Sequence, residues 1–229
     1  MKDLSNLFHQ KRKEPFSSIS GYDDIKNIIN RVLSSEENFN LLLIGPPASC
    51  KTQFSMEIMK INGGKNCVYF DATNTTNRIL QVLEEEKPEI ILLDELDKLP
   101  RVFAEKLLGF LQSGRVKVDQ KNCQMDFELK CKVFATANEI GRISKPLQSR
   151  FMKFYLSRYS EEDALNVSEA VLPKLSPSIV RYIGAKVYQN NGDIRAVINT
   201  GRLIKKEDGP REIEMIMNTL MKYSEAEKK

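Results

Sequence analysis

The sequence predicts an α/β fold in which a parallel sheet of five strands is covered by helices and followed by an all-helical domain. Two observations support this prediction. Short apolar segments alternate with stretches of helical spacing through residues 16–157, an order typical of a parallel sheet with helical crossovers. From residue 158 onward the strand-like segments stop, and helical patterns continue to the end. The five strands are expected over 41–45, 67–72, 90–95, 131–138 and 152–157.

The elements between these strands follow from local signals. Ser20 and Gly21 form a turn, after which isoleucines at helical spacing open the first helix. The segment after the fourth helix alternates like two short strands around a polar tip, which predicts an inserted β-hairpin at 114–130. The remaining helices of this part of the chain are expected over 52–61, 73–86, 101–114 and 144–151.

Length and composition limit the organisation of the chain. Its 229 residues suffice for one large domain and a small second one. We expect a loose polar segment over 1–15, an αβα domain over 16–157 and a helical lid over 158–229. No apolar run is long enough to cross a membrane, and the start lacks the apolar core of a secretory signal.

The cysteine and histidine content and the net charge bear on a metal site, on the cellular compartment and on possible partners. Four cysteines without C-x-x-C spacing and a single histidine argue against a zinc site. They favour reduced thiols and a cytoplasmic protein. The formal charge of +4 permits a nucleic-acid partner without requiring one.

The strand at 41–45 runs into a loop that resembles a phosphate-binding turn. The segment from Gly45 to Thr52 reads GPPASCKT, with a helical pattern after it. In such a loop backbone N–H groups and the helix N-terminus face phosphate oxygens. We expect Lys51 to reach the β- and γ-phosphates and the Thr52 hydroxyl to bind Mg²⁺. Cys50 stands where the pattern has a glycine, and we expect it to hold ordinary helical dihedrals at the start of the helix.

The thiol of Cys50 allows two interpretations. A thiol at a helix N-terminus beside phosphates has a lowered pKa and reacts with oxidants or alkylating agents, which would block ATP. The alternative is that Cys50 is only a small, inert residue that fills the loop.

Two later strands end in polar side chains. Four apolar residues lead into Asp94 and Glu95, so Asp94 is expected to hold Mg²⁺ and Glu95 to activate the attacking water. The strand at 131–138 ends in Asn138, whose amide is expected to position that water. Solvated acids at a strand end, and an asparagine in a turn, are the plainer alternatives. We expect Asp97 to face solvent or to pair with Lys98 or another neighbour.

In this order the motifs resemble the AAA+ ATPase family throughout nearly the whole chain. GPPASCKT resembles its Walker A loop, IILLDE its Walker B strand and ATAN its sensor-1 strand. PLQSRF resembles the arginine-finger helix and GDIR the sensor-2 helix. Within the family, FSSISGYDDIK and the hairpin resemble RuvB, a Holliday-junction branch-migration motor. The small residue before Lys51 resembles the loop of the MCM helicases.

The resemblance implies a P-loop NTPase fold and further site residues. Arg150 would reach the γ-phosphate of a neighbouring subunit, whereas Arg195 on a lid helix would contact the nucleotide of its own subunit. The segment from Ile19 to Tyr22 would pack near adenine. With the loop, the residues expected to bind nucleotide are Ile19, Gly21, Tyr22, Gly45, Pro46, Pro47, Ala48, Ser49, Cys50, Lys51, Thr52, Gln53 and Arg195.

The resemblance also implies function and partners. It favours an ATP hydrolase that uses Mg²⁺ at the subunit interfaces of a homo-oligomeric ring, a hexamer, and that remodels DNA as RuvB does. The basic hairpin at 114–130 is the candidate DNA contact, and a separate DNA-binding protein is a further candidate partner. A motor that unfolds proteins is disfavoured, because segment 71–80 lacks an aromatic residue and a glycine. The alternative is a loader or switch subunit, clamp-loader-like or initiator-like, with slow hydrolysis.

Overall fold

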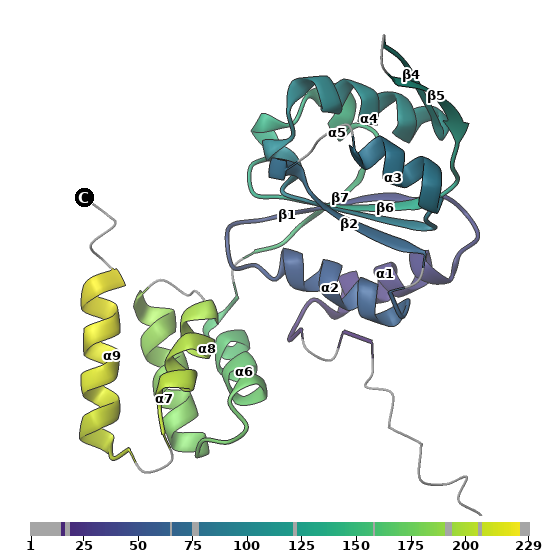
Figure 1. Ribbon diagram of the computed structural model, residues 1–229. Helices are drawn as coiled ribbons and strands as arrows, with labels where there is room; N and C mark the ends of the chain where they lie inside the picture. The colour runs from purple at the N-terminus through teal and green to yellow at the C-terminus, as the bar shows by residue number, and fades with distance from the viewer. Residues whose placement is uncertain are drawn as a thin grey trace, which may run out of the picture.

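A computed structural model describes residues 15–16, 19–64, 66–74, 78–120, 123–157, 159–190, 194–205 and 208–224 (Figure 1). The predicted N-terminal segment lies almost wholly outside these residues, as do the tip of the hairpin and the start of GDIR. Within the described part no helix is both long and apolar enough to cross a membrane.

The sheet of five parallel strands is confirmed. Its strands are β1 (Asn40–Ile44), β2 (Cys67–Asp71), β3 (Ile90–Asp94), β6 (Lys132–Ala137) and β7 (Met152–Tyr155). Their order across the sheet is β2-β3-β6-β1-β7. Since β6 lies between β3 and β1 and all three strands are parallel, their carboxyl ends lie side by side at one edge. The polar residues that follow these three strands are therefore brought together.

Helices cover both faces of the sheet and complete three layers (Figure 1). Helices α1 (Asp23–Ser34) and α2 (Lys51–Ile61) lie on one face, and α3 (Arg78–Glu86), α4 (Arg101–Ser113) and α5 (Lys145–Gln148) on the other. The alternation along β1 matches this arrangement. Leu41 and Leu43 join the core of the first face, whereas Leu42 and Ile44 join that of the second. Both sets are buried, as expected for an inner parallel strand.

The inserted hairpin is also present. Strands β4 (Arg115–Gln120) and β5 (Cys123–Glu128) pair antiparallel and project from the helical layer formed by α3 and α4 (Figure 1). The guanidinium of Arg115 donates to both carboxylate oxygens of Asp126 at 2.6 Å. One of the basic side chains of the hairpin is therefore paired within it.

Among the residues described after 158, the chain forms four helices: α6 (Glu161–Val171), α7 (Pro177–Asn190), α8 (Ile194–Leu203) and α9 (Pro210–Ser224). Ser160 and Asp163 exchange hydrogen bonds in a capping box that starts α6. The helices enclose a hydrophobic core of their own, which includes Tyr159, Ile183 and Met217. We call these helices, together with Tyr159 and Ser160 just before α6, the lid.

Candidate active site

The loop between β1 and α2 is closed by its own contacts. Gly45 has to be glycine, because a Cβ there would lie 2.6 Å from the carbonyl oxygen of Leu156. The buried hydroxyl of Ser49 donates to the carbonyl of Pro46 at 2.8 Å. The loop is therefore a tight turn against the end of β7.

The Lys51 ammonium lies against this loop. Its Nζ donates to the carbonyl oxygens of Gly45 at 2.8 Å and Pro46 at 2.7 Å, and to the Ser49 hydroxyl at 3.1 Å. Lys51 is only 7% exposed. Since a buried cation needs partners, these oxygens hold the positive charge at the loop, where phosphate oxygens would be bound.

The expectation that Cys50 adopts helical dihedrals is wrong. Cys50 has φ 61° and ψ 11°, in the left-handed region, and Ala48 has φ 64°. The turn needs left-handed backbone at both places, where glycine would be free of strain. An L-residue there costs roughly 1–2 kcal/mol. The Sγ atom of Cys50 lies 2.7 Å from the hydroxyl oxygen of Tyr159 in the lid.

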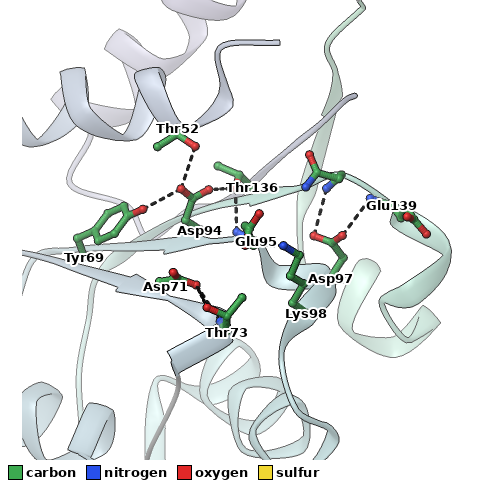
Figure 2. Close-up of polar contacts among 11 residues, drawn as sticks. Thr52, Tyr69, Asp71, Thr73, Asp94, Glu95, Asp97, Lys98, Thr136 and Glu139 are labelled. Atoms are coloured by element: carbon green, nitrogen blue, oxygen red, sulfur yellow. Dashed lines mark hydrogen bonds and ion pairs between the residues drawn. The ribbon is translucent and has the colours of Figure 1, made fainter. Parts of the chain in front are cut away.

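Asp94 is the centre of a hydrogen-bond network at the end of β3 (Figure 2). Its carboxylate accepts from the hydroxyl of Thr52 at 2.9 Å and that of Tyr69 at 2.7 Å, and from the hydroxyl of Thr136. Asp94 is 6% exposed. Burial, followed by the hydrogen bond to Asp94, raises the pKa of Tyr69, so Tyr69 stays a donor at neutral pH. Thr52 and Asp94 thus offer adjacent hard oxygen ligands, which fits Mg²⁺.

Glu95 leaves the strand in a left-handed conformation with φ 58°. Its backbone N–H donates to the Thr136 hydroxyl at 3.1 Å, while its carboxylate lies 2.8 Å from Nζ of Lys98. The single hydroxyl of Thr136 thus accepts from Glu95 and donates to Asp94 (Figure 2). Thr136 fixes both acids relative to β6.

Of the two placements expected for Asp97, the one toward solvent is wrong, and the pairing is with backbone groups instead of with Lys98. Asp97 is 8% exposed, and its carboxylate accepts the backbone N–H groups of Asn138 at 3.1 Å and Glu139 at 3.3 Å (Figure 2). The 3₁₀ turn Leu96–Lys98 turns Asp97 toward the end of β6 instead of toward solvent. Asp97 therefore holds the backbone that carries the Asn138 amide.

Asp94, Glu95, Asn138 and the loop from Pro47 onward line one cavity of about 520 Å³ at the carboxyl edge of the sheet. Its volume lies in the range of small-molecule sites. The cavity brings the loop, the two acids and the amide together, and Gln53 also lies in its wall. The residues that line it are Pro47, Ala48, Ser49, Cys50, Lys51, Thr52, Gln53, Met56, Asp94, Glu95, Lys98, Thr136 and Asn138.

Arg150 is not part of this cavity. Its backbone carbonyl accepts from the side-chain amide of Asn40, at the opposite end of β1. The length of β1 alone puts roughly 13 Å between this carbonyl and the phosphate loop. The guanidinium donates to the Gln112 side-chain oxygen at 3.0 Å and to the Ser149 hydroxyl at 3.1 Å. Arg150 thus lies away from the loop of its own chain.

Of the N-terminal site residues, Tyr22 lies between α2 and the lid. Ile19 is 2% exposed in the core shared with α1 and α2. The Tyr22 ring lies 6.1 Å from that of Phe54 and 5.6 Å from that of Tyr159, between centroids. Burial raises the pKa of Tyr22 to about 12. Arg195 belongs to α8, but its side chain is outside the described part.

Four residues of this region were not predicted: Tyr69, Lys98, Thr136 and Tyr159. Thr136 had a signal in the sequence, since it is a polar residue within an apolar strand, two places before Asn138. Tyr159 had none, because its contact with Cys50 joins positions 109 residues apart.

A glycine turn between β1 and α2, with acids at the end of β3, which β6 separates from β1 in the sheet, defines a P-loop nucleotide-binding fold. Similarity to a known protein family agrees with a P-loop nucleotide-binding fold. Residues 41–159 match the model of the ATPase family associated with various cellular activities (AAA). The chain belongs to this AAA family.

Relatives in the family are distant. The sliding-clamp-loader large subunit of Escherichia phage RB69 is 27% identical over 119 residues, which cover 52% of this chain and 33% of that protein. Lon protease of Escherichia coli is 24% identical over 231 residues, 87% of this chain and 29% of the protease. The chain thus spans about a third of the length of these curated relatives.

Solved structures show the same fold. A mutant of Thermotoga maritima RuvB superposes with a TM-score of 0.70 at 15% identity, over 88% of this chain and 71% of that one. This share of the chain is larger than all of the residues up to the end of the family model at 159, so the match extends into the lid. It bears out the predicted fold of a P-loop domain followed by helices.

Proposed function

We propose that the chain binds ATP with Mg²⁺ in the cavity at the carboxyl edge of the sheet and hydrolyses it as the motor of a RuvB-like DNA-remodelling ring. The observation that carries the proposal is that Glu95, Asp94, Asn138 and the phosphate loop line one cavity. Family membership supports ATP hydrolysis.

The roles follow from the contacts. Lys51 would bind the β- and γ-phosphate oxygens in place of its present carbonyl partners. Thr52 and Asp94 would hold Mg²⁺, which neutralises phosphate charge. Glu95 would accept the proton of the attacking water, and the Asn138 amide would orient that water. Support for these roles comes from the lining of the cavity, which includes all five residues.

The remaining site residues complete the proposal. Arg150, remote from its own loop, would act on the nucleotide of the next subunit in a hexameric ring. The segment from Ile19 to Tyr22 and Arg195 would contact the nucleotide from the lid side. The hairpin would follow a DNA backbone, alone or with a separate DNA-binding protein. Division of the chain near residue 158 would let the lid move as a unit.

A second candidate is a loader or switch subunit with slow turnover. Two observations favour it: the Glu95 carboxylate is paired with Lys98, and a clamp-loader subunit is among the relatives. In this role ATP binding would control assembly on a partner, and hydrolysis would only reset the complex.

Steady-state ATPase activity with Mg²⁺, measured with and without single- and double-stranded DNA, tests the two functions. Stimulation by DNA is expected for the motor, and a rate unaffected by any DNA would contradict the motor and favour the switch. Glu95→Gln should bind ATP but not hydrolyse it, because an amide cannot accept the proton. Lys51→Ala is the control that should lose binding. Hydrolysis by Glu95→Gln at the parent rate would refute the role of Glu95.

A further inference from the structure

The Cys50 side chain leaves the phosphate loop and reaches the lid. Its Sγ lies 2.7 Å from the hydroxyl oxygen of Tyr159. Tyr159 is 5% exposed and belongs to the core formed by α6, α7, α8 and α9, against which Cys50 also packs. The residue just before Lys51 is therefore connected to the core of the lid.

The backbone of Cys50 is strained in the conformation in which its side chain makes this contact. Its φ of 61° is the conformation that glycine adopts without strain, and Ala48 in the same loop has φ 64°. At both positions a glycine would remove the strain, but only at Cys50 does a polar side-chain atom bond to the lid. Strained backbone that persists in a binding loop is a mark of function.

Tyr159 also contacts the N-terminal segment that is proposed to lie beside adenine. The ring of Tyr22 packs on it at 5.6 Å between centroids, and the Tyr22 hydroxyl donates to the carbonyl of Ser157 at 2.7 Å. The carboxylate of Asp163, in the first turn of α6, lies beside Gly21. The phosphate loop and the segment proposed to lie beside adenine thus meet at one lid residue.

We infer that Cys50 is a positioning residue that couples the phosphate loop to the lid through Tyr159. The inference rests on the proposed function only in that a nucleotide occupies the loop. A ligand that changes the conformation of the phosphate loop would then shift the position of the lid. Conversely, a fixed position of the lid would favour one conformation of the loop, because coupling between two sites is reciprocal. Cys50 needs no contact with phosphate for this role.

A double-mutant cycle tests the coupling. Cys50→Gly and Tyr159→Phe should each weaken binding of a fluorescent ATP analogue by about 2- to 13-fold, the equivalent of one hydrogen bond of about 0.5–1.5 kcal/mol. The double variant should bind no more weakly than either single variant, because both remove the same contact. Cys50→Ser should restore affinity, since a hydroxyl can also bond Tyr159. Fully additive losses in the cycle would overturn the inference.

Hydrogen exchange supplies a readout that a purely structural role would not move. Nucleotide should increase the protection of the amides of α6 in the parent chain but not in Cys50→Gly. Lys87→Gly is the matched control, because it relieves left-handed backbone strain of the same kind (φ 44°) at the end of α3, outside the loop and the lid, and should keep the response. A response in Cys50→Gly equal to that of the parent would also overturn the inference.

The proposed function and the coupling can fail separately. If the parent chain binds no ATP, the proposed function fails. The same double-mutant cycle of Cys50→Gly and Tyr159→Phe is then measured as shifts in the midpoint of thermal unfolding without nucleotide. Non-additive shifts in the midpoint would still support the contact between loop and lid, and additive shifts would refute it.

Discussion

The Nζ atom of Lys98 lies 2.8 Å from Oε2 of Glu95, so the carboxylate proposed as the base is already paired with a cation. The hydrogen bond to Glu95 is the largest of the effects that raise the pKa of Lys98, and the charges of Glu95, Asp97 and Asp71 add to it. Lys98 therefore stays charged at neutral pH. A carboxylate held by a lysine has to leave that partner before it can accept a hydrogen bond from an attacking water.

Lys98→Ala should therefore increase the rate of hydrolysis in a single turnover. The pair is exposed and screened by solvent, so the increase should be no more than a few-fold. Lys60→Ala is the matched control, because it removes the pair of the same spacing between Lys60 and Glu57 at the far end of α2. A loss of rate in Lys98→Ala would instead mean that Lys98 assists the chemistry or binds nucleotide.

Thr136→Val should destabilise the fold and slow hydrolysis. Valine keeps the shape but leaves the Glu95 N–H without its acceptor and Asp94 with one donor fewer. Loss of such a partner costs about 1–3 kcal/mol, which a shift in the midpoint of urea unfolding would measure. Thr136→Ser, which keeps the hydroxyl, is the control. An unchanged midpoint for Thr136→Val would contradict the role of this hydroxyl.

Arg150→Ala should reduce hydrolysis by roughly 10³- to 10⁵-fold while nucleotide binding stays intact. Mixing it with Lys51→Ala should restore activity at roughly a quarter of the interfaces, where an intact loop meets an intact arginine. The control is Arg142→Ala, which removes a nearby arginine that is paired with Glu139 instead. A mixture no more active than its components would rule out a site shared between subunits.

Tyr22 should lower stability in alkali. Its pKa is raised to about 12, chiefly by burial and then by the charges of Cys50 and Asp163. Above a pH of about 10 the unfolded chain loses this proton while the folded chain keeps it. The stability present below pH 10 should therefore fall between pH 10 and about 12.

Ultraviolet titration of tyrosinate checks this window. Tyr22→Phe should remove a component with its midpoint near pH 12, whereas Tyr155→Phe, a change at a 65% exposed side chain, should leave that component in place. If Tyr22→Phe leaves the component unchanged, the contacts described for Tyr22 are not those of the folded chain.

The sequence predicted the parts of the site that depend on local order. The apolar strand before Gly45 and the acids after Leu93 identify their strands by themselves, because buried parallel strands are short apolar runs. Parallel strands then bring Glu95 and Asn138 to one edge whatever the rest of the chain does. The alternating pattern at 115–130 predicted the hairpin for the same local reason.

The missed features depend on tertiary contacts. The backbone dihedrals of Cys50 follow from the tight turn against Leu156. This contact is distant in the sequence, so the residues of the loop do not predict it. Asp97 is buried because a 3₁₀ turn directs it to the end of β6, and no periodic pattern marks such a turn. Tyr159 meets Cys50 only when the lid is placed against the sheet domain.

Arg150 and the phosphate loop lie at opposite ends of β1. On the proposed role of Arg150, each copy therefore presents the two halves of a site on different surfaces. A two-fold symmetric dimer, in which each surface meets itself, would leave both sites incomplete. Only head-to-tail contacts join the halves, and an open row of copies always has one complete site fewer than it has copies. Closure of the row would therefore complete the last site, so hydrolysis per copy would report whether the assembly has closed.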